Sequence, residues 1–69
     1  MSVYKVIELV GTSPKSWDDA AKTAVEQAGK SLRDLRVAEV SELDITLDDS
    51  GNVALYRAKV KISFKHEAS

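Results

Sequence analysis

The sequence lacks cysteine altogether, and it has a single histidine, His66. Without cysteine the chain forms no disulfide and no thiolate metal site, and one histidine is a poor basis for a zinc site. No serine or cysteine nucleophile motif surrounds this histidine, and the glycine-rich spacing and lysine of a phosphate-binding loop are missing. The sequence therefore predicts a protein that is not an enzyme.

Long apolar runs are also missing. No stretch approaches the roughly 18 apolar residues of a membrane-spanning helix, and the first residues lack the apolar segment of a signal peptide. Ten basic and eleven acidic residues nearly cancel, so no overall field draws the chain to nucleic acid or to an anionic membrane. We therefore expect a soluble, cytoplasmic protein that binds neither nucleic acid nor membranes.

The chain has 69 residues, which leaves little room for a core. A domain of this length buries only about 60% of the surface that its unfolded chain exposes. Ordering each residue costs roughly 1.5 kcal/mol of conformational entropy, which a small core barely offsets. Since disulfides and structural zinc are excluded, we expect one domain over residues 1–69 that is stabilised by assembly with further copies of itself.

The first half of the chain predicts a strand and then a helix. Residues 3–10 are mostly β-branched, aromatic or apolar, and the Gly-Thr-Ser-Pro sequence at 11–14 is expected to end this strand. The helix is capped either by Ser13, with Pro14 at its first position, or by Ser16. Apolar residues then recur at steps of three and four and predict about five helical turns; they are Trp17, Ala20, Ala21, Ala24, Val25, Ala28, Leu32 and Leu35.

The second half predicts two strands joined by a tight turn at residues 48–52. In residues 37–47 the apolar positions change parity, and a bulge or bend near residues 41–42 would reconcile the two halves. The last strand alternates clearly. Its two sides carry Ala54, Tyr56, Ala58, Val60, Ile62 and Phe64 on one and Arg57, Lys59, Lys61 and Lys65 on the other.

These elements predict an α+β fold of the order β-α-β-β, in which a three-stranded antiparallel sheet packs on one long helix. A right-handed crossover places the first two strands parallel, and the third strand fills the gap between them, antiparallel to both. The helix covers one face of the sheet. We expect the other face to carry the basic residues together with Leu43, Ile45 and Leu47, and to meet neighbouring subunits or a ligand.

The basic residues of the last strand have two interpretations. They form cross-strand ion pairs with acids such as Glu39, Glu42 or Asp44, or they line a cavity that binds an anionic ligand. Direct binding to nucleic acid is disfavoured because exposed aromatic residues are not interleaved with the basic ones.

Three acidic residues are candidate metal ligands. Glu42 and Asp44 lie two positions apart on a strand and so share a face, and Asp48 belongs to an oxygen-rich turn. Calcium takes about six to eight oxygens, which several copies related by symmetry would have to supply. The alternatives are ion pairing to the basic strand for Glu42 and Asp44, and a polar hairpin tip for Asp48.

The order of elements, the Val-Gly-Thr-Ser turn at 10–13, the Ala-Glu-Val stretch at 38–40 and the last strand resemble those of the dodecins, small proteins that assemble into hollow twelve-subunit shells. The resemblance covers nearly the whole chain and implies a hollow homododecamer. Dodecins stack flavins on a tryptophan and hydrogen-bond them to a glutamine. The matching positions here are Val37 and Arg57.

Valine has no aromatic ring face, and such stacking contributes roughly 0.5–1.5 kcal/mol beyond the buried area. Flavin binding in the usual stacked mode is therefore not expected, although Val37, Arg57 and Lys65 would contact another flat anionic ligand. The chain is most similar to the branch described as calcium-binding dodecins. The resemblance implies a shell that binds and sequesters a small ion or ligand, calcium first; storage of flavin or another flat anion, and a purely structural oligomer, are the alternatives.

Overall fold

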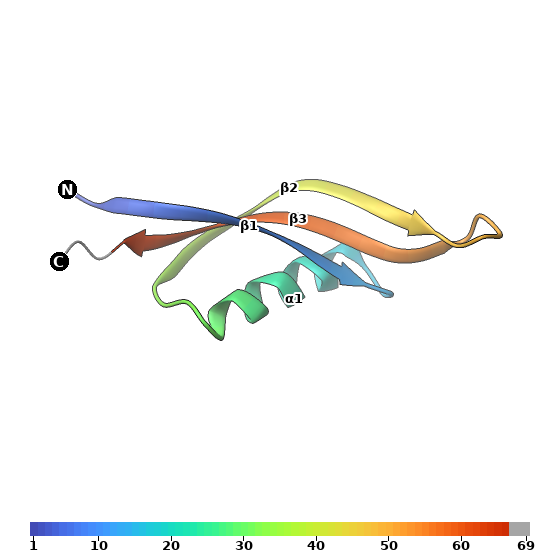
Figure 1. Cartoon of the computed structure of the whole chain (residues 1–69), viewed down its shortest axis with the longest axis horizontal. Helices are drawn as coiled ribbons and strands as arrows, with labels where there is room; N and C mark the ends of the chain where they lie inside the picture. Colours follow the sequence, from blue (N-terminus) through green and yellow to red (C-terminus); the bar gives the residue numbers. More distant parts are fainter. Residues whose placement is uncertain (67–69) are drawn as a thin grey trace.

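The computed structural model describes residues 1–66, which form four elements in the expected order (Figure 1). They are β1 (Val3–Ser13), α1 (Trp17–Gly29), β2 (Leu35–Leu47) and β3 (Val53–His66). β3 lies between β1 and β2 and pairs antiparallel with both, as predicted. Within this part of the chain, no helix is long and apolar enough to cross a membrane.

β1 continues three residues beyond its predicted end, because residues 11–13 still pair with β3. Gly11 faces the helix there. A Cβ atom at this position would lie 2.0 Å from the carbonyl oxygen of Ala20. The glycine thus serves the close approach of α1 to β1 and does not end the strand.

α1 begins after Ser16, whose Oγ accepts a hydrogen bond of 3.0 Å from the backbone N–H of Asp19. Of the two predicted caps, Ser16 is therefore the one used. Ser13 supports it, because its Oγ donates a 2.7 Å hydrogen bond to the Asp19 carboxylate. Ser13 is almost completely buried.

The helix ends at Gly29, six residues before the predicted end at Leu35. The apolar spacing continues past this point because Leu32 and Leu35 still pack against the core, from the connecting loop and from the first residue of β2. Between them the chain turns at Asp34, which has a left-handed backbone with φ 58°. The prediction was wrong here because a loop and a strand fill the same core that a longer helix would fill.

β2 contains a register shift between Val40 and Glu42, which confirms the predicted bulge. Its effect differs from the expectation. Beyond the bulge, Leu43 and Ile45 stand opposite Ala58 and Tyr56, on the side of the sheet that faces α1. The bulge therefore returns these two apolar side chains to the helix side, and the prediction that they lie on the opposite face was wrong.

The core is small and made of small side chains. Its buried apolar residues come from α1 and β3 and are Ala20, Ala24, Ala28, Ala58, Val60 and Ile62. α1 covers the middle of the sheet, and the β2–β3 hairpin extends beyond it (Figure 1). We call residues 43–56 the hairpin arm. Several of its large apolar side chains are 41–59% exposed, namely Leu43, Ile45, Leu47 and Val53.

Candidate functional site

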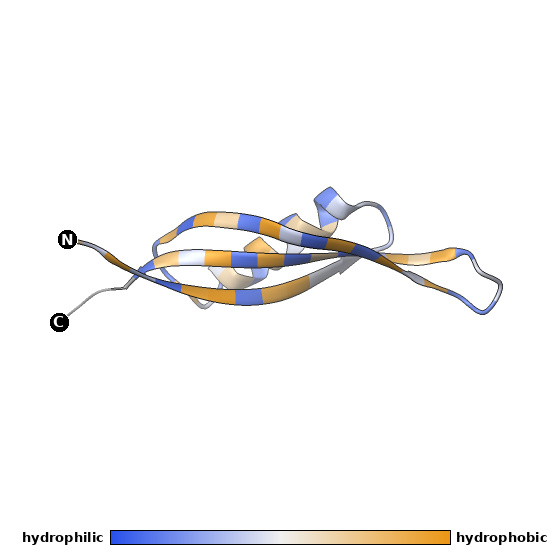
Figure 2. Ribbon diagram, turned by 90° about the horizontal axis from the view of Figure 1, so that it is seen from above, coloured by the Kyte–Doolittle hydropathy of each residue, from blue (hydrophilic) through white to orange (hydrophobic). Residues whose placement is uncertain are grey.

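The open face of the sheet, the face turned away from α1, carries most of the predicted site residues. Ala58, Val60 and Ile62 of β3 are buried beneath the sheet, so the residues that alternate with them point to the open face. Figure 2 views the sheet with α1 behind it and shows hydrophilic and hydrophobic residues alternating along the strands. The strand register then decides which side chains stand side by side on this face.

The middle of the open face is a ladder of opposite charges. Glu8 of β1 and Glu39 of β2 both stand opposite Lys61 of β3. The neighbouring Lys59 places its Nζ 3.6 Å from Glu8 Oε2 and 4.0 Å from Glu42 Oε1. Each of these groups is substantially exposed, so the pairs contribute little individually. The ladder matches the ion-pair interpretation of the basic strand.

Arg57 and Asp44 form the tightest pair of the ladder. Arg57 Nε donates to Asp44 Oδ1 at 2.6 Å, and Arg57 Nη2 donates to Asp44 Oδ2 at 2.9 Å. The hydrogen bond from Arg57 and its positive charge hold the pKa of the Asp44 carboxyl below its ordinary value, although desolvation acts in the opposite direction. The same contacts raise the pKa of Arg57 above its ordinary value.

The main chain of Asp44 is held from the other side of the sheet. Trp17, at the start of α1, donates a 2.9 Å hydrogen bond from Nε1 to the carbonyl oxygen of Asp44. Its ring also meets the edge of Tyr56, with centroids 5.2 Å apart and planes at 76°. Trp17 thus contacts both Tyr56 and the main chain of Asp44, and it stays 39% exposed.

The predicted cofactor contacts are spread along the open face. Val37 stands opposite Ser63, near the chain ends, and its side chain is 61% exposed. Lys65 lies two residues further along β3 and is exposed. Arg57 lies six residues before Ser63 on β3, which amounts to about 20 Å along an extended strand. One subunit therefore does not bring Val37 and Arg57 together, and a ligand that touches both needs a second copy.

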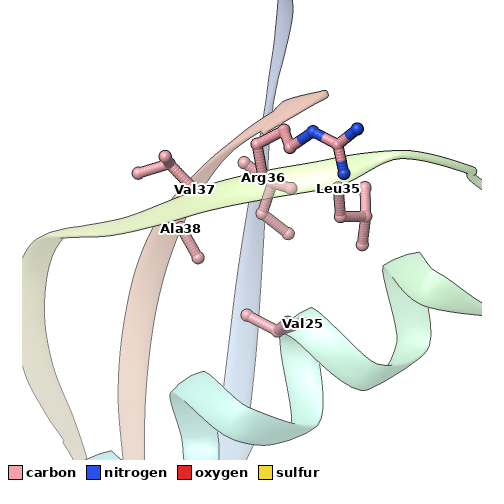
Figure 3. A pocket seen from close by; sticks show the side chains of 6 residues that line it. Val25, Leu35, Arg36, Val37 and Ala38 are labelled. Atoms are coloured by element: carbon pink, nitrogen blue, oxygen red, sulfur yellow. The ribbon is translucent and has the colours of Figure 1, made fainter. Parts of the chain in front are cut away.

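The cavity next to Val37 is apolar and small (Figure 3). Its volume is about 180 Å³, and it lies between α1 and β2, lined by Val25 of α1 and by Leu35 and Ala38 of β2. Figure 3 shows the Val37 side chain on the other side of the strand from α1. Ligand pockets are typically larger, about 300–1,000 Å³. This hollow does not hold a flat ring system within one subunit.

The predicted metal ligands do not form a cluster in one chain. Within residues 1–66 no three acidic or histidine side chains are arranged to hold a metal ion. Asp48 lies at the hairpin tip, where its Oδ1 accepts hydrogen bonds of 2.9 Å from the backbone N–H groups of Ser50 and Asn52. The donors are hard carboxylate oxygens, which calcium prefers, but about six to eight are needed. The carboxylates that one chain brings together here do not by themselves complete a calcium site.

Two participants in this site were not predicted to belong to it. Glu8 joins the ladder through the register of β1 with β3, and Trp17 reaches Asp44, which is 27 residues away in sequence. The alternation of β1 places Glu8 on the same side as Tyr4 and Val6, but only the pairing with β3 shows which cation it meets. No local pattern in the sequence indicates the contact between Trp17 and Asp44.

Comparison with known proteins gives a consistent set of relatives. A family model described as Dodecin matches residues 3–67. The chain is 52% identical over 65 residues to the calcium dodecin of Mycobacterium tuberculosis, covering 94% of this chain and 90% of the relative. It is 38% identical over 65 residues to the dodecin of Thermus thermophilus, covering 94% and 93%.

Solved structures agree with these matches. A crystal structure of the Mycobacterium tuberculosis calcium dodecin, described as calcium chelating and as having a novel calcium-binding site, superposes with a TM-score of 0.85 at 50% identity. The alignment covers 99% of this chain and 96% of that chain. The dodecin from Streptomyces coelicolor superposes with a TM-score of 0.91 at 38% identity, with the same coverage of both chains.

Proposed function

The chain belongs to the dodecin family, and from that premise we propose that it forms a hollow homododecamer that binds and sequesters a small ion, calcium first. Dodecamers are the assembly of this family. The single observation that carries the calcium proposal is the 52% identity, over 94% of this chain, to a relative named calcium dodecin. We propose no enzymatic role. The cytoplasmic location and a single domain over residues 1–69 stay predictions.

The geometry of the single subunit supports assembly. The hairpin arm extends past α1 and exposes large apolar side chains, including Leu43 at 53% and Leu47 at 59%. Burying such a side chain contributes about 1.5–3 kcal/mol, which favours contact between arms and neighbouring subunits. The core beneath the sheet consists mainly of alanines, with Val60 and Ile62, and is small for a stable monomer.

The open face supports ion binding within such an assembly. Glu42 and Asp44 point to this face from β2, and both are more than half exposed at the side chain. In our proposal, copies of these carboxylates meet at a symmetry axis and together supply the oxygens that calcium needs. Bound calcium would there neutralise and cross-link carboxylates of adjacent subunits. Asp48, at the hairpin tip, is a further candidate ligand apart from Glu42 and Asp44.

Flavin storage is the weaker alternative. Val37 presents a branched aliphatic side chain where a stacked ring system would need an aromatic face. We expect riboflavin fluorescence to be quenched weakly or not at all by the unmodified protein. Val37→Trp combined with Arg57→Gln should raise riboflavin affinity, whereas tight quenching by the wild type would contradict the assignment of Val37 as a non-stacking residue.

Calcium binding is tested by metal analysis of the purified protein and by isothermal titration after chelator treatment. We expect calcium heat in the wild type and less heat in Glu42→Gln with Asp44→Asn. The matched pair Asp48→Asn with Asp49→Asn should matter only if the hairpin tip is the site. Magnesium should compete poorly, because it demands a tighter octahedral shell. Absence of both calcium heat and thermal stabilisation by millimolar calcium would leave a purely structural oligomer.

A further inference from the structure

The hairpin arm loses the support of the third strand at its base. The last residue pair between β1 and β3 joins Ser13 to Tyr56. Beyond this pair, within the described residues, β2 and β3 pair only with each other, so residues 46–54 form a two-stranded ribbon that projects past α1 (Figure 1). An isolated two-stranded hairpin is marginally stable in water. The arm therefore keeps one direction only if contacts at its base or in a neighbouring subunit hold it.

The sheet bends just before the arm begins. The register of β2 with β3 shifts between Val40 and Glu42, directly before Leu43. A bulge of this kind bends the strand that carries it and increases its twist. The direction of the arm relative to α1 therefore depends on this bend and on the contacts that the arm makes beyond it.

Trp17 contacts both strands of the arm at its base. Its indole Nε1 donates a 2.9 Å hydrogen bond to the carbonyl oxygen of Asp44 on β2. Its ring packs in a T-shaped arrangement with the ring of Tyr56 on β3, with centroids 5.2 Å apart and planes at 76°. Both partners belong to the arm, so these contacts link α1 to the arm on the far side of the bulge.

The backbone that carries Trp17 is fixed to the rest of the subunit. Trp17 is the first residue of α1 and follows the capping residue Ser16. In the same turn, the Asp19 carboxylate accepts a 2.7 Å hydrogen bond from the buried Ser13 at the end of β1. The start of α1 thus contacts all three strands, and Trp17 extends this fixed point to the arm.

We propose that Trp17 is a positioning residue for assembly, which holds the hairpin arm in the direction that a second copy of the chain receives. The inference rests on the assembly proposed above and involves no metal site. Exposed apolar side chains of the arm, such as Leu43 and Leu47, make the contact with the neighbour, whereas Trp17 acts through the arm. An arm that is already ordered in the free subunit lowers the entropic cost of association.

The first test follows amide hydrogen exchange of the assembled protein by mass spectrometry. Trp17→Phe keeps an aromatic ring against Tyr56 but has no N–H for Asp44, so it removes a contact made within the chain. Exchange in residues 46–54 should rise about two- to tenfold, the factor that corresponds to one hydrogen bond. Trp17→Leu removes both contacts and should raise this exchange further. Exchange in residues 58–62, the part of β3 with buried core residues, should stay unchanged.

The second test measures assembly by light scattering over a dilution series at one fixed, sub-denaturing guanidinium concentration. The protein concentration at which the assembly dissociates should rise about two- to tenfold in Trp17→Phe, and further in Trp17→Leu. Tyr4→Leu is the matched control, because it removes another half-exposed aromatic side chain at the end of β1 far from the arm. It should leave both the exchange of the arm and the dissociation concentration at their wild-type values. Circular dichroism verifies that each variant is folded.

The outcomes separate this role from assembly itself. Faster exchange confined to the arm, together with easier dissociation of both Trp17 variants, would support the proposal. Arm exchange no faster than in Tyr4→Leu would overturn it, and so would faster exchange throughout the chain, which indicates a general loss of stability. A looser arm in an equally stable assembly would also overturn it, while the proposed assembly stands. A wild type that stays monomeric would contradict the assembly and this role together.

Discussion

At Gly11 the backbone of β1 lies close to the backbone of α1. A methyl group there would meet the carbonyl oxygen of Ala20 at 2.0 Å and the Cβ of Ala24 at 3.0 Å. The first neighbour is backbone, so relief would require the whole helix to shift. Gly29 differs, because a Cβ there would meet only the Leu35 side chain at an ordinary 3.8 Å.

We therefore predict that Gly11→Ala destabilises the fold by about 1–3 kcal/mol, the usual cost of overpacking a core. Gly29→Ala, the matched control, should be neutral or stabilising by up to about 1 kcal/mol, because it reduces the entropy of the unfolded chain. Guanidinium denaturation at one fixed protein concentration measures both. Equal midpoints for the two variants would contradict the close-approach role of Gly11.

Asp44 makes stability depend on pH. Its pKa is lowered in the folded state, chiefly by the hydrogen bond from Arg57, so folding favours the ionised carboxylate. The stabilisation is fully present above the unfolded pKa, near the ordinary value of 3.8, and is lost as the pH falls through the lower folded value.

We predict that Asp44→Asn is less stable than wild type at neutral pH, in the presence of chelator. The difference in denaturation midpoint should narrow as the pH falls below the ordinary carboxyl range, and also at high salt, because the pair is exposed. Asp49→Asn, which removes a carboxylate from the exposed hairpin tip, is the control and should show no such narrowing. A difference that stays constant down to acid pH would contradict the ion pair as its cause.

At the scale of elements, the start of α1 is built from two serines with different roles. Ser16 caps the helix by accepting from the Asp19 N–H, and the buried Ser13 anchors the Asp19 carboxylate to the end of β1. The acidic residues in this first turn also interact favourably with the positive end of the helix dipole. The Ser13–Asp19 hydrogen bond therefore ties the start of the helix to β1, as the bond from Trp17 to Asp44 ties it to β2.

Ser16→Ala should destabilise the protein by about 1 kcal/mol, because one backbone N–H at the helix start loses its partner. Ser16→Asn retains a capping oxygen and should restore most of the loss. Thermal denaturation followed by circular dichroism compares them, with Ser31→Ala, an exposed serine beyond the end of the helix, as the control. A full loss in Ser16→Asn would point to a role of this serine other than capping.

At the scale of the whole molecule, the subunit is elongated, with extents of 53 × 19 × 15 Å. α1 covers the middle of the sheet, while the hairpin arm projects beyond it with its apolar side chains exposed (Figure 1). The bulge in β2 places Leu43 and Ile45 on one side of this arm. An elongated subunit with an apolar arm is suited to contact several neighbours in a closed shell.

Leu43→Glu should therefore break or weaken the assembly, because it introduces a charge into a contact that buries apolar surface. We expect light scattering after size exclusion to give the mass of about twelve subunits for the wild type, the assembly of the family, and a smaller mass for Leu43→Glu. Gln27→Glu adds the same charge on the exposed side of α1 and should leave the mass unchanged. A folded Leu43→Glu variant with the wild-type mass would place the contact elsewhere.

Local patterns in the sequence were sufficient for the element order, the hairpin turn, the bulge near Ser41 and the membership of the dodecin family, all of which are confirmed. Each of these follows from residues close together in the chain, such as the alternation along β3 or Gly51 in the turn, which has φ 82°. The short length of the chain and its lack of cysteine also indicate assembly, because a small core needs some further source of stability.

The tertiary structure decided how distant residues meet. The end of α1 at Gly29, the side on which Leu43 lies and the contact of Trp17 with Asp44 all depend on packing between elements. The partner of each charge on the open face depends on strand register, and one bulge shifts that register for every residue beyond it. Side-chain alternation is a local property that the sequence shows directly. The pairing of Arg57 with Asp44 follows only once β2 and β3 lie side by side.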